Sequence, residues 1–257
     1  MPSKSELKDR YRGVMDRVAA AAERSGRRPE DVLVVAVTKT AGPDEIRQLI
    51  DMGHVDLGEN RVQQLQQRAA MTDEFLGRRQ QMGGSDATEA PAEVRWHMTG
   101  HLQRNKVKAV LPLVRLIHSV DSLRLAEELE AQGARAERDV QVLIQVNIAG
   151  EAQKHGVALP AVEHLSEQIE TMVRLQLRGL MVIGPNTDDP EQNRDVFERA
   201  ADLFREVRAS GVNTDRFNIL SMGMSDDFEV AIEEGANVVR VGRAIFGDQT
   251  NGDPDDR

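Results

Sequence analysis

The stretch Asp31-Val-Leu-Val-Val-Ala-Val-Thr-Lys39 is an apolar, mostly β-branched run that ends on a lysine. Such a run is typical of a strand that is buried on both faces, as the strands of parallel sheets are. A helical pattern opens at Pro43, where proline fits the first turn, and Gly53 closes it. The stretch therefore predicts one strand–helix unit of an α/β fold.

Seven more strand-like runs follow, and each leads into a helical pattern or the start of one. They lie at residues 54–57, 95–99, 116–119, 140–147, 175–183, 217–220 and 237–241. Eight units in 257 residues are the number in a (β/α)8 TIM barrel, so we predict a single-domain barrel as the fold. A doubly wound open sheet is the alternative, but no Gly-x-Gly-x-x-Gly turn follows the first run.

The predicted barrel occupies residues 1–247, with an amphipathic N-terminal helix over about 3–25. A basic helix is expected over 102–114. The polar stretch from Gln80 to Glu93 is typical of a mobile loop, and the acidic residues 248–257 are typical of a disordered tail.

The composition excludes several kinds of function. The chain has no cysteine, which excludes a disulfide scaffold, an iron–sulfur cluster and a thiol nucleophile. Acidic residues outnumber basic ones 43 to 33, which counts against a broad nucleic-acid surface. Neither a signal peptide nor an apolar run near the roughly 18 residues of a membrane span is found. We expect a cytoplasmic monomer without nucleic-acid or membrane partners.

Lys39 is the first candidate functional residue, because active sites of barrels lie at the carboxyl ends of the strands. It shares the register of Val35 and Val37, so it points the same way as these apolar side chains. A desolvated lysine has a lowered pKa and becomes a nucleophilic amine suited to Schiff-base chemistry. The alternative, a lysine that extends into solvent at the strand end, stays open.

The turns after the seventh and eighth strands favour an anion. Ser221-Met-Gly-Met-Ser225 offers two hydroxyls, and Gly242-Arg243 leads into a short helical segment with free amides and a cation. Barrels often bind phosphate between these two turns, although two ordinary loops are the alternative. Arg240 alternates with Val238 and should face the interior, where it needs an acceptor.

His97 and His101 raise the question of a metal site. They flank a strand end and Gly100, so they are not expected to share one helical face. Single histidines on turns more often form hydrogen bonds, and we predict no metal site.

Taken together, these motifs resemble the YggS/PROSC family of pyridoxal phosphate homeostasis proteins, whose fold is similar to the barrel domain of alanine racemase. The eight-residue string Leu220–Asp227 is the most specific match. The other matching segments follow the chain in order and are Val35–Thr40, Leu57–Arg61, Trp96–Lys106, Val142–Ile148, Lys154–Gly156, Leu177–Met181 and Val239–Gly247.

The resemblance implies fold-type III and a bound pyridoxal 5′-phosphate (PLP). Lys39 would hold PLP as a Schiff base, Arg240 would face the pyridine nitrogen, and Asn60 would be a further contact on the ring side. Ser221 and the amides around Gly242 and Arg243 would bind the phosphate. The family often has Thr or Ser in place of Arg243, so one hydroxyl contact to the phosphate is lost here. The residues implied as cofactor contacts are Lys39, Asn60, Ser221, Arg240, Gly242 and Arg243.

The function implied is PLP homeostasis, in which the protein buffers PLP, delivers it to apo-PLP enzymes and affects the balance of amino and keto acids. No catalytic residue and no robust turnover are expected. An arginine at the ring nitrogen weakens the ring as an electron sink, and the only tyrosine, Tyr11, lies in the first helix instead of a second, catalytic domain. Two alternatives stay open: a PLP-dependent racemase or decarboxylase of low activity, and a barrel enzyme acting on a phosphorylated sugar through Lys39.

Overall fold

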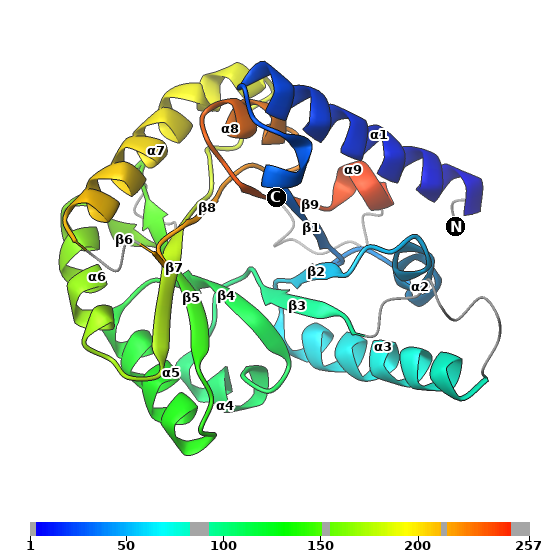
Figure 1. Cartoon of the computed structure of the whole chain (residues 1–257), viewed down its shortest axis with the longest axis horizontal. Helices are drawn as coiled ribbons and strands as arrows, with labels where there is room; N and C mark the ends of the chain where they lie inside the picture. Colours follow the sequence, from blue (N-terminus) through cyan, green and yellow to red (C-terminus); the bar gives the residue numbers. More distant parts are fainter. Residues whose placement is uncertain (1–3, 83–92, 151–154, 212–214, 248–257) are drawn as a thin grey trace.

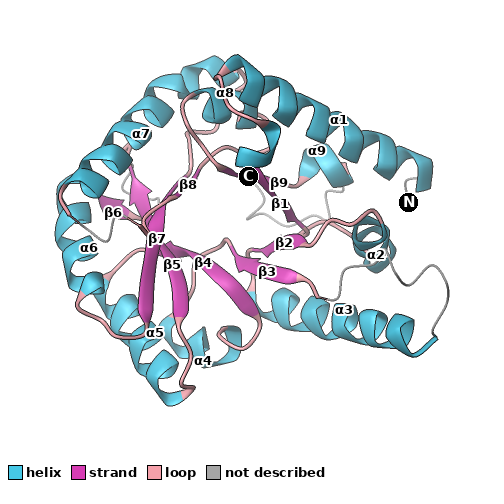
Figure 2. Ribbon diagram, in the orientation of Figure 1, coloured by secondary structure: helices cyan, strands magenta, loops and turns pink. Residues whose placement is uncertain are grey.

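The computed structural model describes residues 4–82, 93–150, 155–211 and 215–247. Eight parallel strands close into a barrel, because β4 pairs with β5 and β1 pairs with β9. Helices form a ring outside the strands (Figures 1 and 2). The predicted (β/α)8 barrel is therefore confirmed. Its strands are β1 (Leu33–Val37), β2 (Asp56–Glu59), β3 (Arg95–Met98), β4 (Val114–Val120), β5 (Val140–Asn147), β7 (Leu175–Val182), β8 (Ile219–Ser221) and β9 (Val238–Val241).

The helices follow the strands in the predicted alternation. Short 3-10 turns precede several of them, among them η3 (Arg104–Lys106) and η5 (Pro190–Asn193). The α-helices are α1 (Lys4–Arg24), α2 (Pro43–Asp51), α3 (Val62–Met82), α4 (Val107–Val110), α5 (Leu123–Arg135), α6 (Val162–Glu170), α7 (Arg194–Ala209), α8 (Phe228–Glu233) and α9 (Arg243–Phe246). None of the helices in the described ranges is long and apolar enough to cross a membrane.

Two local predictions were wrong, and one short strand was not predicted. The basic helix expected over 102–114 is only η3 and α4, since Pro112 cannot continue a helix and β4 begins at Val114. Gln80 to Met82 belong to α3, because glutamine, arginine and methionine are good helix formers. A two-residue strand, β6 (Val157–Ala158), pairs with β5 and is too short for a sequence pattern to show. The rest of the expected loop, 83–92, and the expected tail, 248–257, lie outside the described residues.

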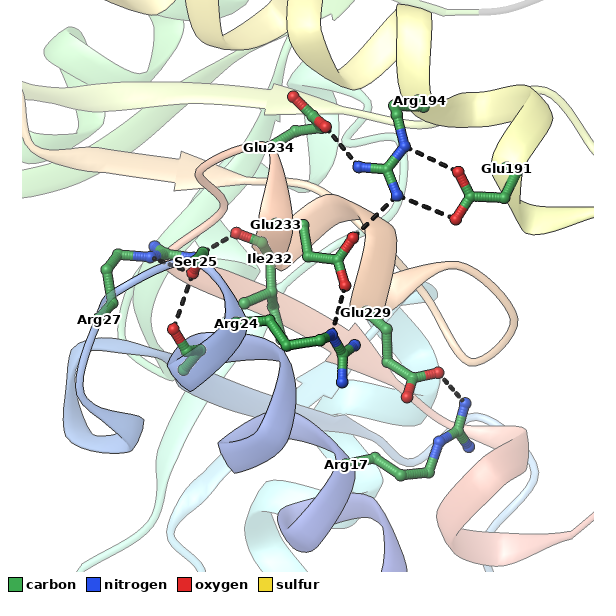
Figure 3. A network of polar contacts seen from close by, with 11 residues as sticks. Arg17, Arg24, Ser25, Arg27, Glu191, Arg194, Glu229, Ile232, Glu233 and Glu234 are labelled. Atoms are coloured by element: carbon green, nitrogen blue, oxygen red, sulfur yellow. Dashed lines mark hydrogen bonds and ion pairs between the residues drawn. The ribbon is translucent and has the colours of Figure 1, made fainter.

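A network of ion pairs and hydrogen bonds connects the N-terminal helix α1 to α7 and α8 (Figure 3). Arg194 of α7 binds Glu191 at 2.7 Å, Glu233 at 2.8 Å and Glu234 at 2.5 Å. Glu233, at the end of α8, also accepts a hydrogen bond from Arg24 of α1 at 2.7 Å. Because α8 leads directly into β9, the network holds the strand that carries Arg240.

The barrel interior has an apolar side and a polar side. Leu116, Leu143 and Met181, on β4, β5 and β7, form a small buried cluster that is separate from the larger core. That larger core lies between the strands and the helices and includes Leu49 and Phe197. Polar side chains of β2, β3, β4, β8 and β9 are hydrogen-bonded to one another on the other side of the interior.

Candidate functional site

Lys39 lies in the turn that follows β1, two residues beyond Val37, and is half-buried. Arg68 of α3 donates hydrogen bonds to the backbone carbonyl oxygens of this turn. The acceptors are Thr38, Lys39 at 3.3 Å and Ala41 at 3.0 Å. Arg68 therefore fixes the backbone that carries Lys39.

Glu59, the last residue of β2, is fully buried and holds Arg68 in place. Its carboxylate accepts hydrogen bonds from the Arg68 guanidinium and from the Thr38 hydroxyl. Burial raises the pKa of Glu59, and the positive charge of Arg68 opposes that rise. The sequence did not reveal Arg68, because a helical pattern does not show which distant group a polar side chain reaches.

Asn60 follows Glu59 at the carboxyl end of β2, next to β1 in the sheet. Its Oδ1 atom is buried and has no hydrogen-bond partner among the described residues. Gly100 packs against the backbone of Asn60, and any β-carbon at Gly100 would collide with it. An unpartnered buried acceptor of this kind fits a donor on a bound ligand.

Arg240 of β9 points into the barrel, as its alternation with Val238 predicts, and its exposed fraction is only 4%. Nη1 donates to Ser221 Oγ at 2.7 Å, and Nη2 donates to the carbonyl oxygen of Val182 at 2.9 Å. Burial lowers the pKa of Arg240 to about 10, so the guanidinium stays charged at neutral pH. Arg240 is in register with Val35 of β1, which places it on the strand beside the one that leads to Lys39.

Ser225 and Gly242 bring the turns after β8 and β9 together. The Ser225 hydroxyl oxygen accepts hydrogen bonds from the backbone amides of Gly242 and Ala244, each at 3.2 Å. A β-carbon on Gly242 would lie 3.1 Å from the carbonyl oxygen of Val37, so this turn packs against the end of β1. Glycine permits that close approach.

Two side chains expected at the phosphate have other partners, and the expected Gly242 amide donates to Ser225. The buried hydroxyl of Ser221 accepts a hydrogen bond from Arg240 and lies 3.1 Å from His118 Nδ1. The exposed guanidinium of Arg243 is paired with Asp226. The hydroxyl at the turn amides is that of Ser225, which was not among the implied cofactor contacts, although the Ser-x-x-x-Ser spacing gave a signal for it.

His97 and His118 lie inside the barrel and were not predicted as site residues. His97 Nδ1 is 3.0 Å from His118 Nε2, and His97 Nε2 is 3.1 Å from Asp56 Oδ1. Asp56 also accepts from Arg95. The two histidines thus join Asp56 to Ser221 and Arg240 through unbroken hydrogen bonds.

His101 lies apart from His97, on the rim at the carboxyl ends of the strands. Its ring stacks on that of His155, with centroids 4.0 Å apart. Asp121 Oδ2 is 3.1 Å from His101 Nδ1 and 3.8 Å from His155 Nδ1. The three ligand atoms lie within 4.8 Å of one another, so this rim cluster has the residue types and spacing to hold a metal ion.

A cavity of about 430 Å³ opens at the opposite end of the barrel, where the strands begin. Its lining includes Arg95, Trp96, Val114, Arg138 and Gln141. None of the predicted cofactor contacts lines it. Those contacts instead lie at or just beyond the carboxyl ends of β1, β2, β8 and β9, which are consecutive in the closed sheet, so the structure brings them to one side of the barrel mouth.

Comparison with known proteins agrees with this arrangement. The sequence profile of the alanine racemase N-terminal domain matches residues 16–250. A pyridoxal phosphate homeostasis protein of Aquifex aeolicus is 36% identical over 245 residues, which cover 94% of this chain and 97% of that protein. The chain belongs to the pyridoxal phosphate homeostasis protein family. A protein of the same name from Escherichia coli is 35% identical, over 91% of this chain and 93% of that protein.

Solved structures resemble the barrel closely. A protein of unknown function from Bifidobacterium adolescentis superposes with a TM-score of 0.83 at 38% identity, and the match covers 95% of each chain. PipY of Synechococcus elongatus, solved with PLP bound, superposes with a TM-score of 0.73 at 31% identity, over 91% of this chain and 100% of PipY. The family resemblance predicted from the motifs is therefore confirmed.

Proposed function

We propose that this protein binds PLP at the carboxyl ends of β1, β2, β8 and β9 and acts as a cytoplasmic store that passes the cofactor to enzymes requiring it. One observation carries the proposal. The turn at Gly242 packs against the end of β1, two residues before Lys39, and brings the Ser225 hydroxyl, which accepts from the amides of this turn, close to the strand that leads to the lysine. An amine and an anion site on neighbouring strands match the aldehyde and phosphate ends of PLP.

Each end of the cofactor has a matching group in this chain. Lys39 would condense with the aldehyde, with loss of water, and Arg68 holds the backbone of the lysine turn in place. Ser225 accepts two backbone hydrogen bonds through its oxygen, which leaves its hydroxyl hydrogen for a phosphate oxygen. Asn60 contributes an unpartnered acceptor, and Arg240 contributes a buried positive charge for the ring.

Two features support storage over turnover. Arg240 is charged at neutral pH and can only donate hydrogen bonds, so it opposes protonation of a ring nitrogen and weakens the electron sink that PLP supplies when bound. The hydroxyl of Tyr11, the only tyrosine, lies 3.2 Å from His54 Nδ1. His54 precedes β2, so Tyr11 lies toward the amino ends of the strands, away from the proposed site. It cannot act as a base at the site from there.

Titration of the purified protein with PLP tests the proposal. We expect a visible Schiff-base absorbance band that grows to one equivalent and is absent in Lys39→Ala. Lys108→Ala, which removes an exposed lysine of α4, is the matched control and should keep the band. A wild-type protein that stays colourless, or a band that survives Lys39→Ala, would contradict the assignment.

Incubation of the loaded protein with a panel of amino acids separates storage from catalysis. Chiral and mass analysis should show no racemised or decarboxylated product beyond that formed by free PLP. Lys39-dependent turnover above that background would support an enzyme in place of a store.

A further inference from the structure

A single file of hydrogen bonds crosses the barrel interior from Arg240 to Asp56. It runs from Arg240 to Ser221 at 2.7 Å and from Ser221 to His118 at 3.1 Å. It continues from His118 to His97 at 3.0 Å and from His97 to Asp56 at 3.1 Å. The five residues are at most 4% exposed, so bulk water does not supply their hydrogen-bond partners.

The charges in this file indicate that both histidine rings are neutral. Arg240 at one end carries a positive charge, and the Asp56 carboxylate at the other is already paired with Arg95. A protonated imidazole would add a second buried, uncompensated positive charge, which is costly in a low-dielectric interior. For His118, burial is the largest cause that lowers the pKa well below its usual value, and the positive charge of Arg240 acts in the same direction.

With neutral rings, the carboxylate fixes the direction of every hydrogen bond. Asp56 can only accept, so His97 donates from Nε2 and has a bare Nδ1. That bare nitrogen accepts from His118 Nε2–H, which leaves His118 Nδ1 bare in turn. His118 Nδ1 then accepts the Ser221 hydroxyl hydrogen, and the Ser221 oxygen offers its lone pair to Arg240.

We propose that Asp56 is a positioning residue for the cofactor site, acting through His97 and His118 to commit the Ser221 hydroxyl hydrogen to the interior and to hold Arg240 as a fixed donor. This inference rests on the proposed function for its consequence, because Arg240 is the group assigned to the PLP ring. It also assigns Ser221 to the support of Arg240 and leaves the hydroxyl contact to phosphate to Ser225.

The opposite direction has a different chemical result. If the His97 and His118 rings carried their protons on Nδ1, His118 would donate to Ser221. The Ser221 oxygen would then accept from both neighbours, and its hydrogen would be free to point at a phosphate. The position of one proton on each ring therefore separates the two roles of Ser221.

Nitrogen-15 NMR of the histidine rings tests the direction in the full chain without PLP. Substituting the three exposed histidines, His101→Gln, His155→Gln and His164→Gln, leaves three rings to assign. We expect His97 and His118 both to be neutral and protonated at Nε2 at pH 7. A proton on Nδ1 of either ring would overturn the proposal.

The Asp56→Asn variant tests whether the Asp56 carboxylate sets the hydrogen-bond direction at Ser221 and affects PLP binding. Its amide can donate to His97, so the file can reverse, and we expect an Nδ1–H population on His118. His118 and Arg240 would then both donate to the Ser221 oxygen, which loosens its hydrogen bond to Arg240, and we expect PLP binding about tenfold weaker. Glu167→Gln, which changes a carboxylate 3.9 Å from exposed His164, is the matched control and should leave both unchanged. Circular dichroism confirms that each variant is folded.

The two proposals fail in distinguishable ways. Nε2–H rings in a protein that does not bind PLP would refute the proposed function and leave the hydrogen-bond direction standing. PLP binding that Asp56→Asn does not weaken, in a folded variant, would refute the positioning role and leave the proposed function standing.

Discussion

Ser221 and Ser225 are four residues apart in the chain, yet their hydroxyls have different surroundings. Ser221 closes β8, is fully buried and lies between Arg240 and His118. Ser225 lies beyond the strand and accepts hydrogen bonds from the backbone amides of the turn after β9. The difference shows that the hydrogen-bond partners of each serine, and not its position in the motif, decide whether its hydroxyl is available to a ligand. Ser221 supports a charge, and Ser225 is placed to meet a ligand.

Removing Arg240 should cause the largest loss of PLP affinity, and it tests the role given to Ser221 as the partner of Arg240. In Arg240→Gln the buried charge is lost and Ser221 loses its charged donor, so we expect PLP affinity to fall by about 1.5–3 kcal/mol, the range for hydrogen bonds to charged groups. Equilibrium dialysis with PLP measures the affinity, and the visible spectrum of the loaded variant should shift. An unchanged spectrum would show that Arg240 does not face the ring.

The paired variants Ser225→Ala and Ser221→Ala sharpen the comparison directly. Ser225→Ala should weaken PLP binding by about 1–2 kcal/mol, because it removes a ligand contact. It also leaves the amides of Gly242 and Ala244 without their acceptor, but these amides are only part-buried, so the loss in melting temperature should be smaller than in Ser221→Ala. Ser221→Ala should instead lower the melting temperature clearly, because Arg240 Nη1 and His118 Nδ1 each lose a buried hydrogen bond. Its loss of PLP affinity should be smaller than that of Ser225→Ala. Equal affinity losses in both would contradict the division of roles.

The pH dependence of stability is the smallest expected effect and probes the partner of Ser221. Burial lowers the pKa of His118 below its ordinary value of 6.5, so below that pH the unfolded chain binds a proton that the native state does not. Stability should therefore fall as the pH drops through about 6.5. Urea unfolding between pH 7.5 and 5.5 measures the slope, which His118→Gln should reduce. An identical slope in the variant would assign the dependence to other groups.

The barrel could be predicted because its signals are local. Each strand is a short apolar run, each helix has an apolar face, and the lysine and the glycine–arginine turn fall where strands end. Alternation within β9 was enough to place Arg240 in the interior. The motifs also gave the family, since they occur in order along nearly the whole chain.

The rest of the site could not be predicted because it depends on which residues of different units meet. Asp56, His97 and His118 come from three strands, and only the closed barrel brings them into one file. Arg68 binds a turn about 30 residues earlier, across a helix–strand contact that no periodicity encodes. The sequence showed two serines in the loop but not which one would face inward.

Borohydride reduction of the PLP-loaded protein, followed by peptide mass spectrometry, tests the central claim most directly. Reduction converts a Schiff base into a stable secondary amine and so marks the lysine that carries PLP. We predict a single pyridoxyl group on the peptide that contains Lys39. A pyridoxyl group on another lysine with Lys39 unmodified, or none in a protein that binds PLP, would contradict the account.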